Sequence, residues 1–201
     1  MLLRHVLTPP PTTLPRTVRA GDVGGPVAFA ELRTSRRLVM LAPDVAVLPG
    51  ASVTRTDRLV ALAARIPPRT VVGRLSAVWV HTGHGDPRTL AVLYPPTAHR
   101  PTRRPDLRTH QATVADDDVE GLGGLLVTRP LRTAVDLARH VPRELSLPAL
   151  ERLCHDGLLD TARLAACLRA HPPGPLASES LDVVAELAAL VSPRQRPGHD
   201  T

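Results

Sequence analysis

Residues 121–140 read GLGGLLVTRPLRTAVDLARH, which predicts a short strand, a tight corner and an amphipathic helix. Gly124 to Thr128 form an apolar run of strand type, and Pro130 then fixes φ at a value suited to the first turn of a helix. The hydroxyl of Thr128 is expected to cap that helix. Apolar residues follow at helical spacing: Leu131, Ala134, Val135 and Ala138. One face of the helix is therefore expected to be buried.

A second patterned block, VVGRLSAVWVHTG, occupies residues 71–83. It predicts a short helix that carries Trp79 with other apolar residues on one side and ends at Gly83. We interpret Trp79 as a core residue, because stacking on nucleic-acid bases would require an exposed ring. His81 is expected to close the helix as a C-terminal cap, where the helix dipole tolerates its charge.

The two blocks, with the strand-like LAVLYPP between them, resemble the AbiEi-type antitoxin family of high-GC Gram-positive bacteria. The matching segments are SAVWVH at residues 76–81 and LVTRPLRTAVDLAR at residues 126–139, within a resemblance that extends from about Arg37 to Ala170. It implies a DNA-binding antitoxin that represses its own operon through an N-terminal winged helix. It further implies that the protein opposes a nucleotidyltransferase-like toxin without forming a stable complex with it.

The resemblance also implies a structural role for the residues that carry the two motifs. Arg132 and Asp136 lie four residues apart on the predicted helix and can pair across one turn, a contact that contributes a few tenths of a kcal/mol in this orientation. Their match to the family motif implies that Arg132 reaches a strand-end carbonyl and that Asp136 holds it in place. The motif residues with this structural assignment are Trp79, His81, Thr128, Pro130, Arg132 and Asp136.

Composition excludes several classes of protein. The chain has 201 residues, 43% of them hydrophobic, and contains no apolar run near the roughly 20 residues needed to span a bilayer. All 25 basic residues are arginine, so mechanisms that need a lysine ammonium are excluded, among them a P-loop lysine, a Schiff base and a Ser-Lys dyad. The two cysteines, Cys154 and Cys167, form neither a disulfide framework nor a zinc motif, and this fits a cytoplasmic protein.

Charge is unevenly distributed along the chain. Residues 1–110 carry 16 arginines and 6 acidic residues, whereas residues 111–201 carry 9 arginines and 13 acidic residues. The basic part is therefore the one expected to contact a polyanion. Arginine-rich loops are also common in proteins of GC-rich genomes, so charge alone leaves nucleic-acid binding open.

Residues 27–49 predict the back half of a winged helix, because a short helix near residues 29–36 is followed by two strand-like runs with a Pro-Asp corner between them. Three arginines lie where a recognition helix would meet phosphates and are predicted to contact DNA: Arg33, Arg36 and Arg37. The Gly-rich segment before this pattern does not accommodate the two helices of a front half. The alternative is a hairpin that merely packs on the next domain.

The remaining sequence predicts an α+β fold, with a small sheet beside helices and an all-helical C-terminal third. Strands are expected near residues 90–94 and 107–114, and Ser146, Asp160 and Ser178 are expected to cap three helices in the last third. The predicted domains are a flexible arm at 1–22, a reduced winged-helix-like module at 23–53, an α+β antitoxin-like domain at 54–192 and a disordered tail at 193–201.

No catalytic, metal or cofactor site is predicted. His81 and His84 are separated by the helix-breaking Gly83 and lack neighbouring residues with metal-ligand spacing. The acidic run at 116–118 is typical of a solvated turn rather than of a cation site. Cys154 and His155 point apart on a helix, so we interpret them as a core thiol and a surface imidazole.

A nuclease is the rival enzymatic interpretation. Some relatives of the family carry a nuclease-like domain after a Ser-x-x-Glu segment, which Ser178-Glu179-Ser180 followed by Glu186 weakly resembles. The residues beyond Glu186 are too few for a catalytic sheet, and we expect no enzyme activity. The alternative to a DNA-binding antitoxin is therefore a degenerate nuclease-family relative that acts as a non-catalytic scaffold or partner-binding module.

Overall fold

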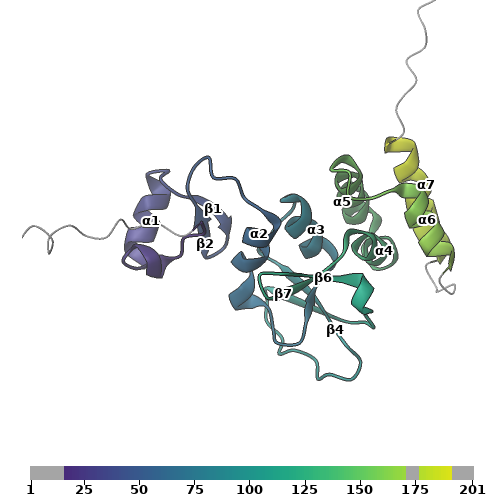
Figure 1. Cartoon of the computed structure of the whole chain (residues 1–201), viewed down its shortest axis with the longest axis horizontal. Coiled ribbons are helices and arrows are strands. Elements are labelled where there is room, and N and C mark those ends of the chain that lie inside the picture. The colour runs from purple at the N-terminus through teal and green to yellow at the C-terminus, as the bar shows by residue number, and fades with distance from the viewer. Residues whose placement is uncertain (1–15, 171–176, 192–201) are drawn as a thin grey trace, which may run out of the picture.

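The computed structural model describes residues 16–170 and 177–191, and the fold is α+β, as predicted. A small N-terminal module, a sheet with helices on it and a group of helices follow one another along the long axis (Figure 1). The helices are α1 (Pro26–Thr34), α2 (Arg55–Ala61), α3 (Arg74–Thr82), α4 (Pro130–His140), α5 (Arg143–His155), α6 (Thr161–Ala170) and α7 (Ala177–Val191). The strands are β1 (Val39–Ala42), β2 (Val45–Val47), β3 (Val71–Val72), β4 (Leu90–Tyr94), β5 (Leu107–Gln111), β6 (Val119–Leu122) and β7 (Leu125–Thr128). Within the described residues, no helix is both long enough and apolar enough to cross a bilayer.

The central sheet is mixed, with the strand order β5-β4-β3-β7-β6. Its middle strand, β3, runs antiparallel to β4 and parallel to β7, so Val72 is paired with Val92 on one side and with Val127 on the other. All three valines are completely buried. Strand β3 begins the first motif block and β7 lies in the second, so the two blocks are adjacent in the middle of the sheet.

Helices α2 and α3 lie on one side of this sheet (Figure 1). Apolar residues of the sheet and of both helices form one core, which includes Leu59, Leu62 and Trp79. Trp79 is only 4% exposed, which confirms its predicted place in the core.

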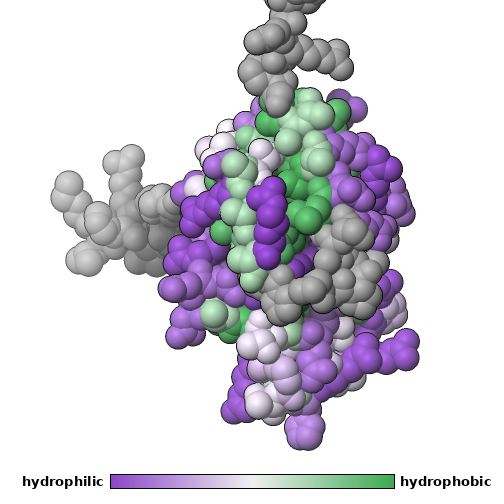
Figure 2. Space-filling view, turned by 90° about the vertical axis from the view of Figure 1, so that its right-hand side faces the viewer, coloured by the Kyte–Doolittle hydropathy of each residue, from purple (hydrophilic) through white to green (hydrophobic). Residues whose placement is uncertain are grey.

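The helices α4, α5, α6 and α7 enclose a second core. Its largest completely buried side chains are leucines: Leu137, Leu150, Leu153, Leu164 and Leu187. Figure 2 looks onto the end of the molecule formed by α6 and α7, where apolar residues also reach the surface. Leu190 and Val191 near the end of α7 are among the exposed ones.

Of the helix caps predicted in this part of the chain, one is confirmed by the structure and one is not. Asp160 precedes α6, and its carboxylate accepts a hydrogen bond from the Ala162 amide at 2.9 Å, which confirms that cap. The prediction for Ser146 was wrong, because α5 begins at Arg143 and Ser146 is buried inside the helix. The Ser178 side chain and the predicted tail at 193–201 lie outside the described part of the chain.

The N-terminal module consists of α1 and the β1–β2 ribbon, in the predicted order. Its small core joins Phe29 of α1 to Ala46 of β2 and to Val18. The backbones of Val18 and Ala46 exchange two hydrogen bonds, of 2.7 and 2.8 Å. Residues 16–22 therefore belong to the module, and the predicted arm was too long; residues 1–15 lie outside the described residues.

The ribbon also packs on the sheet domain, so the alternative of a packed hairpin describes it equally well. Ala46 contacts the core of the module, whereas Val45 and Ala42 belong to the core beneath α2 and α3. The ribbon thus lies between the two parts, and α1 is left at the far end of the molecule (Figure 1).

Strands β6 and β7 are joined by a two-residue turn at Gly123 and Gly124. Their φ angles are 57° and 79°, the combination that a type I′ turn requires and that glycine adopts without strain. A Cβ atom at Gly123 would lie 2.8 Å from Cγ2 of Val60 in α2, whereas one at Gly124 would meet nothing within 4 Å. The turn pairs Leu122 with Leu125 and brings β7 beside β3.

We predict that Gly123→Ala destabilises the fold more than Gly124→Ala does. The left-handed backbone alone costs about 1–2 kcal/mol in either variant. Gly123→Ala must in addition displace Val60, which lies in the helix that covers the sheet. Denaturant unfolding of the two single variants measures the difference, and equal losses of unfolding free energy would contradict this role of the turn.

Candidate functional site

A buried hydrogen bond joins the two motif blocks. His81 lies in the last turn of α3 with its side chain completely buried, and its Nε2 atom is 2.7 Å from the carbonyl oxygen of Thr128 at the end of β7. Because a carbonyl oxygen can only accept, Nε2 carries the proton. The imidazole therefore ties the end of α3 to the corner where β7 turns into α4.

His81 is not the C-terminal cap that the sequence predicted. Helix α3 ends at Gly83, as predicted, with φ of 77° and with the Gly83 amide bonded to the Trp79 carbonyl at 2.8 Å. The carbonyls of Val80 and His81 accept hydrogen bonds from Arg58 of α2, at 2.7 and 3.0 Å. Arg58 supplies the positive charge that the helix end favours, and the imidazole turns inward instead.

Burial lowers the pKa of His81, although the hydrogen bond to Thr128 and the nearby Glu120 carboxylate oppose this shift. The imidazole is therefore neutral near pH 7. Its Nδ1 atom lies 3.6 Å from Oε1 of Glu120, and with a neutral ring this approach is not an ion pair. Glu120 pairs instead with Arg55, at 2.9 Å.

Thr128 and Pro130 form the corner between β7 and α4. Pro130 is the first residue of α4, as predicted, but the N-cap is Arg129 rather than Thr128, and the expected capping hydrogen bond is replaced by another contact. The Thr128 hydroxyl lies 2.7 Å from the Thr133 hydroxyl, and both residues are completely buried. This hydroxyl pair ties the end of the strand to the first turn of the helix.

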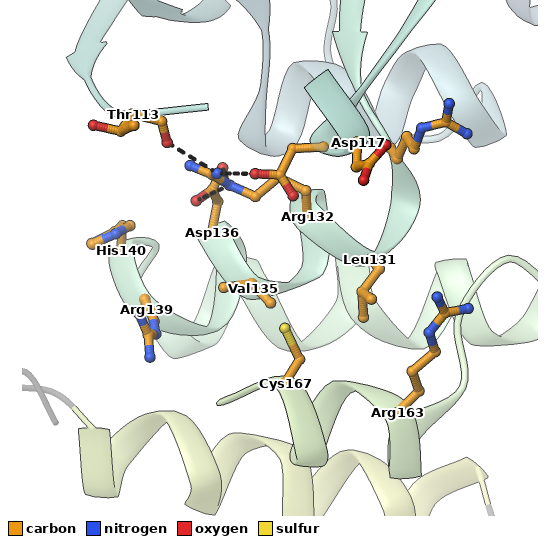
Figure 3. A pocket seen from close by; sticks show the side chains of 12 residues that line it. Thr113, Asp117, Leu131, Arg132, Val135, Asp136, Arg139, His140, Arg163 and Cys167 are labelled. Carbon is orange, nitrogen blue, oxygen red and sulfur yellow. Dashed lines mark hydrogen bonds and ion pairs between the residues drawn. The ribbon is translucent and has the colours of Figure 1, made fainter. Parts of the chain in front are cut away.

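Arg132 makes further contacts at the corner between β7 and α4 (Figure 3). We call this corner and the residues that hold it, His81, Thr128, Thr133, Arg132 and Asp136, the motif junction. Its Nε atom lies 3.1 Å from both carboxylate oxygens of Asp136, and its Nη1 atom lies 2.6 Å from Asp118 Oδ2. The same Nη1 donates to the carbonyl of Thr113, just beyond β5, at 3.1 Å. Arg132 thus reaches a strand-end carbonyl while Asp136 holds it. Burial lowers the pKa of Arg132, but the carboxylates of Asp136 and Asp118 outweigh burial and raise it, so the group stays charged.

A cavity lies beside Arg132. It measures about 350 Å³ and is also lined by Arg129, Arg139 and Arg163. Asp118, which was expected in a solvated turn, and Asp136 are both paired with Arg132. Across residues 16–170 and 177–191, no three metal-ligating side chains form a cluster. Of the three carboxylates that line this cavity, Asp118 and Asp136 are thus engaged in holding the guanidinium of Arg132.

The other candidates for chemistry are dispersed. Burial raises the pKa of the Cys154 thiol, which packs against the helical core, while His155 is an exposed imidazole beside Asp156. The two neighbours therefore point apart, as predicted. Glu186, considered as part of a nuclease motif, pairs with Arg143.

The arginines predicted to contact DNA lie at the end of α1. Arg33 is in the last turn, whereas Arg36 and Arg37 follow the helix, and Arg36 has φ of 59°. All three are exposed, and none of the ion pairs in the described part of the chain involves them. We call this group, Arg33, Arg36 and Arg37, the α1 arginine surface.

The described part of the module lacks the front helices of a winged helix. Only the short 3-10 turn Ala20–Val23 precedes α1 among the described residues, whereas a helix-turn-helix module places further helices there. Residues 16–53 thus contain the helix α1 and the β1–β2 ribbon of the predicted module, but not the front half of a winged helix.

Two arginines that organise the site were not identified from the sequence. Arg58 contacts carbonyls 22 and 23 residues further along the chain, and Arg74, which begins α3, lies 3.3 Å from His110. Neither contact leaves a local sequence pattern. The absence of lysine was the available signal, because every cation that satisfies a carbonyl here must be an arginine.

We predict that His81 makes the protein less stable in acid. Because its pKa is lowered in the folded state, the unfolded chain takes up the proton first as the pH falls below about 6.5, and stability present at pH 7 is lost. His81→Gln keeps a donor for Thr128 but cannot titrate, so its unfolding free energy is expected to depend less on pH between about 5 and 7. His81→Ala is expected to lose about 3 kcal/mol at pH 7, through the cavity and the unpaired carbonyl.

The matched control is His155→Gln, because His155 is exposed on α5. Urea unfolding between pH 5 and 7 tests the three variants. The interpretation fails if His81→Gln keeps the full pH dependence of the natural protein.

We predict that Arg132→Met costs about 3–5 kcal/mol, because it leaves the buried carboxylate of Asp136 without its partner. The double variant Arg132→Met with Asp136→Leu is expected to recover much of this loss. Arg152→Met removes a pair of the same residue types and spacing on α5, but the Arg152–Asp156 pair is more exposed, so it is expected to cost less than about 1 kcal/mol. Thermal and denaturant unfolding measure all three, and similar losses for the two single variants would refute the role of Arg132.

Comparison with known families matches residues 70–178 to the AbiEi antitoxin C-terminal domain. The match covers more than half of the chain and contains both motif blocks and the whole central sheet. A comparison with curated proteins gave no match. The α1 arginine surface lies before the matched region. The extent of this match shows that the chain belongs to the AbiEi antitoxin family, whose members are antitoxins of toxin–antitoxin systems.

Proposed function

We propose that this antitoxin binds DNA through the α1 arginine surface and thereby represses its own operon. The proposal rests mainly on the side chains of Arg33, Arg36 and Arg37. All three are exposed, and none of them takes part in an ion pair among the described residues. Exposed guanidinium groups without carboxylate partners are the side chains that phosphates attract most strongly.

The other arginines of the module support this distinction. Arg16 donates to the Ser52 carbonyl at 2.9 Å and lies 3.5 Å from Asp57, and Arg19 pairs with Asp44 at 3.0 Å. Both serve to hold the module together and to attach it to α2. The arginines of residues 16–53 that stand outside the ion pairs of the described residues therefore all lie at the C-terminal end of α1.

The position of the arginines indicates contacts to phosphates rather than to bases. Recognition helices read bases mainly from their N-terminal residues, whereas later residues meet the backbone. The first turn of α1 presents Val27, which is 83% exposed, and Ala30 follows on the exposed side. Small apolar side chains of this kind can contact thymine methyl groups, so base reading is assigned to Val27 and Ala30.

We further propose that the protein opposes a nucleotidyltransferase-like toxin in the cytoplasm, without a stable complex and without catalysis of its own. The support is the family together with the engagement of Asp118 and Asp136 by Arg132, which leaves these carboxylates unsuited to catalysis. The alternative, a non-catalytic scaffold derived from a nuclease, would not require the charges of the α1 arginine surface.

We predict that binding to the DNA upstream of the gene weakens with salt, with a log–log slope of about −2 to −4, as expected for two to four phosphate contacts. Replacing Arg33, Arg36 and Arg37 together by Gln is expected to remove most of this slope. Fluorescence anisotropy at several salt concentrations measures it.

The control replaces three arginines of the helical part, Arg139, Arg163 and Arg169, by Gln, which removes the same charge from another surface. If both triple variants lose affinity equally, binding is not located at α1. If the natural protein does not bind this DNA at low salt, the proposal is wrong and the scaffold alternative is favoured.

A further inference from the structure

A second cavity, which shares only His140 with the cavity beside Arg132, is largely apolar. It measures about 610 Å³, within the range of small-molecule sites, and residues of α3, β5 and α5 line it. Leu75 and Leu145 line it and are 37% and 51% exposed, respectively. Two exposed leucines facing one cavity leave apolar surface that an organic ligand can cover.

Arg74 lines the same cavity and has an unfavourable backbone conformation and an unsatisfied nitrogen atom. It is the first residue of α3 with φ of 51°, a left-handed conformation that costs about 1–3 kcal/mol in a residue other than glycine. Its Nε atom is buried without a hydrogen-bond partner among the described residues. Within residues 16–170 and 177–191, its Nη1 contacts Nε2 of His110, at 3.3 Å. The carboxylate that acts on Arg74 from a distance, that of Asp136, is already paired with Arg132.

The described lining of this cavity contains no carboxylate that lacks an ion pair. His110 has its pKa lowered to about 4 by burial and by Arg74, and the pKa of His140 is lowered by burial and by Arg74 as well. Both imidazoles are therefore neutral at pH 7. Asp86 also lines the cavity, but it pairs with Arg88 at 2.9 Å.

The positive charge continues beyond the cavity. Arg108 lines both this cavity and a neighbouring depression of the surface, together with His110. Three arginines of the preceding loop also line the depression, Arg100, Arg103 and Arg104, of which Arg104 pairs with Asp106. Such a surface favours a group with more than one negative charge, and thus a phosphate over a carboxylate.

We propose that this cavity binds a small organic phosphate monoester. The phosphate pairs with the guanidinium group of Arg74, with Arg108 at the rim. The apolar body of the ligand covers Leu75 and Leu145. This site is separate from the α1 arginine surface, so its test does not depend on DNA binding.

Phenyl phosphate is a suitable probe, because it combines the two features in one small molecule. Calorimetry is expected to give saturable binding with a Kd of about 1 mM or tighter, and the His110 ring resonances are expected to shift during an NMR titration. Inorganic phosphate, which lacks the apolar body, and benzoate, which has a single charge, are expected to bind more weakly.

Arg74→Gln is expected to weaken phenyl phosphate binding about tenfold or more, as for the loss of a charge-assisted hydrogen bond. The matched control is Arg69→Gln, because Arg69 is also an arginine with positive φ but does not line the cavity. Leu145→Gln, an exposed position where misfolding is not expected, provides a second variant and is expected to weaken phenyl phosphate but not inorganic phosphate.

Three results would overturn the proposal. The first is no saturable binding of phenyl phosphate, and the second is an equal loss in Arg74→Gln and Arg69→Gln. The third is benzoate binding as tightly as phenyl phosphate, which would exclude phosphate as the preferred group.

Discussion

The hydrogen bond from His81 to the Thr128 carbonyl is the contact on which the arrangement of the domain depends. It is buried, it is made by a neutral imidazole, and it connects the two segments that carry the family's sequence motifs. The same segments meet again in the sheet, where Val72 of β3 is paired with Val127 of β7. Through these two connections the helix α3, the middle of the sheet and the start of α4 hold a single relative position. His81, Thr128 and Arg132 of the two motif blocks therefore make contacts that hold the fold together.

A chain without lysine uses arginine for two different purposes. Arg58, Arg65 and Arg132 are at least partly buried and donate to backbone carbonyls, which they connect across elements far apart in the sequence. Such arginines contribute to the basic composition but are not available to a ligand. Arg33 and Arg74 differ from these. Arg33 is exposed and takes part in none of the ion pairs among the described residues. The Nε atom of Arg74 is buried and has no hydrogen-bond partner among the described residues. The bonding state of each guanidinium, rather than the net charge, thus distinguishes candidate binding surfaces from structural links.

The sequence predicted most of the local structure and less of the long-range structure. The α+β class, the helix–ribbon order, the end of α3 at Gly83 and the start of α4 at Pro130 follow from local propensity and were confirmed. The strand β3 was not predicted, because two residues are too few to show a period and its stability comes from neighbours on both sides. The predicted caps at Thr128 and His81 were wrong for a related reason. The His81 ring bonds instead to the Thr128 carbonyl, 47 residues further along the chain, and the Thr128 hydroxyl meets the Thr133 hydroxyl. These buried contacts outweigh the local capping role that a sequence pattern suggests.

The motif junction holds the fold together, and we propose that the end of α1 binds DNA. Hydrogen–deuterium exchange of the full chain, with and without the DNA upstream of its gene, tests both halves of this claim in one measurement. Added protection is predicted in α1 and in the residues that follow it up to Leu38, with no change from Leu125 to His140. Protection at the motif junction, or no protection at α1 under conditions where the DNA is bound, would contradict the account.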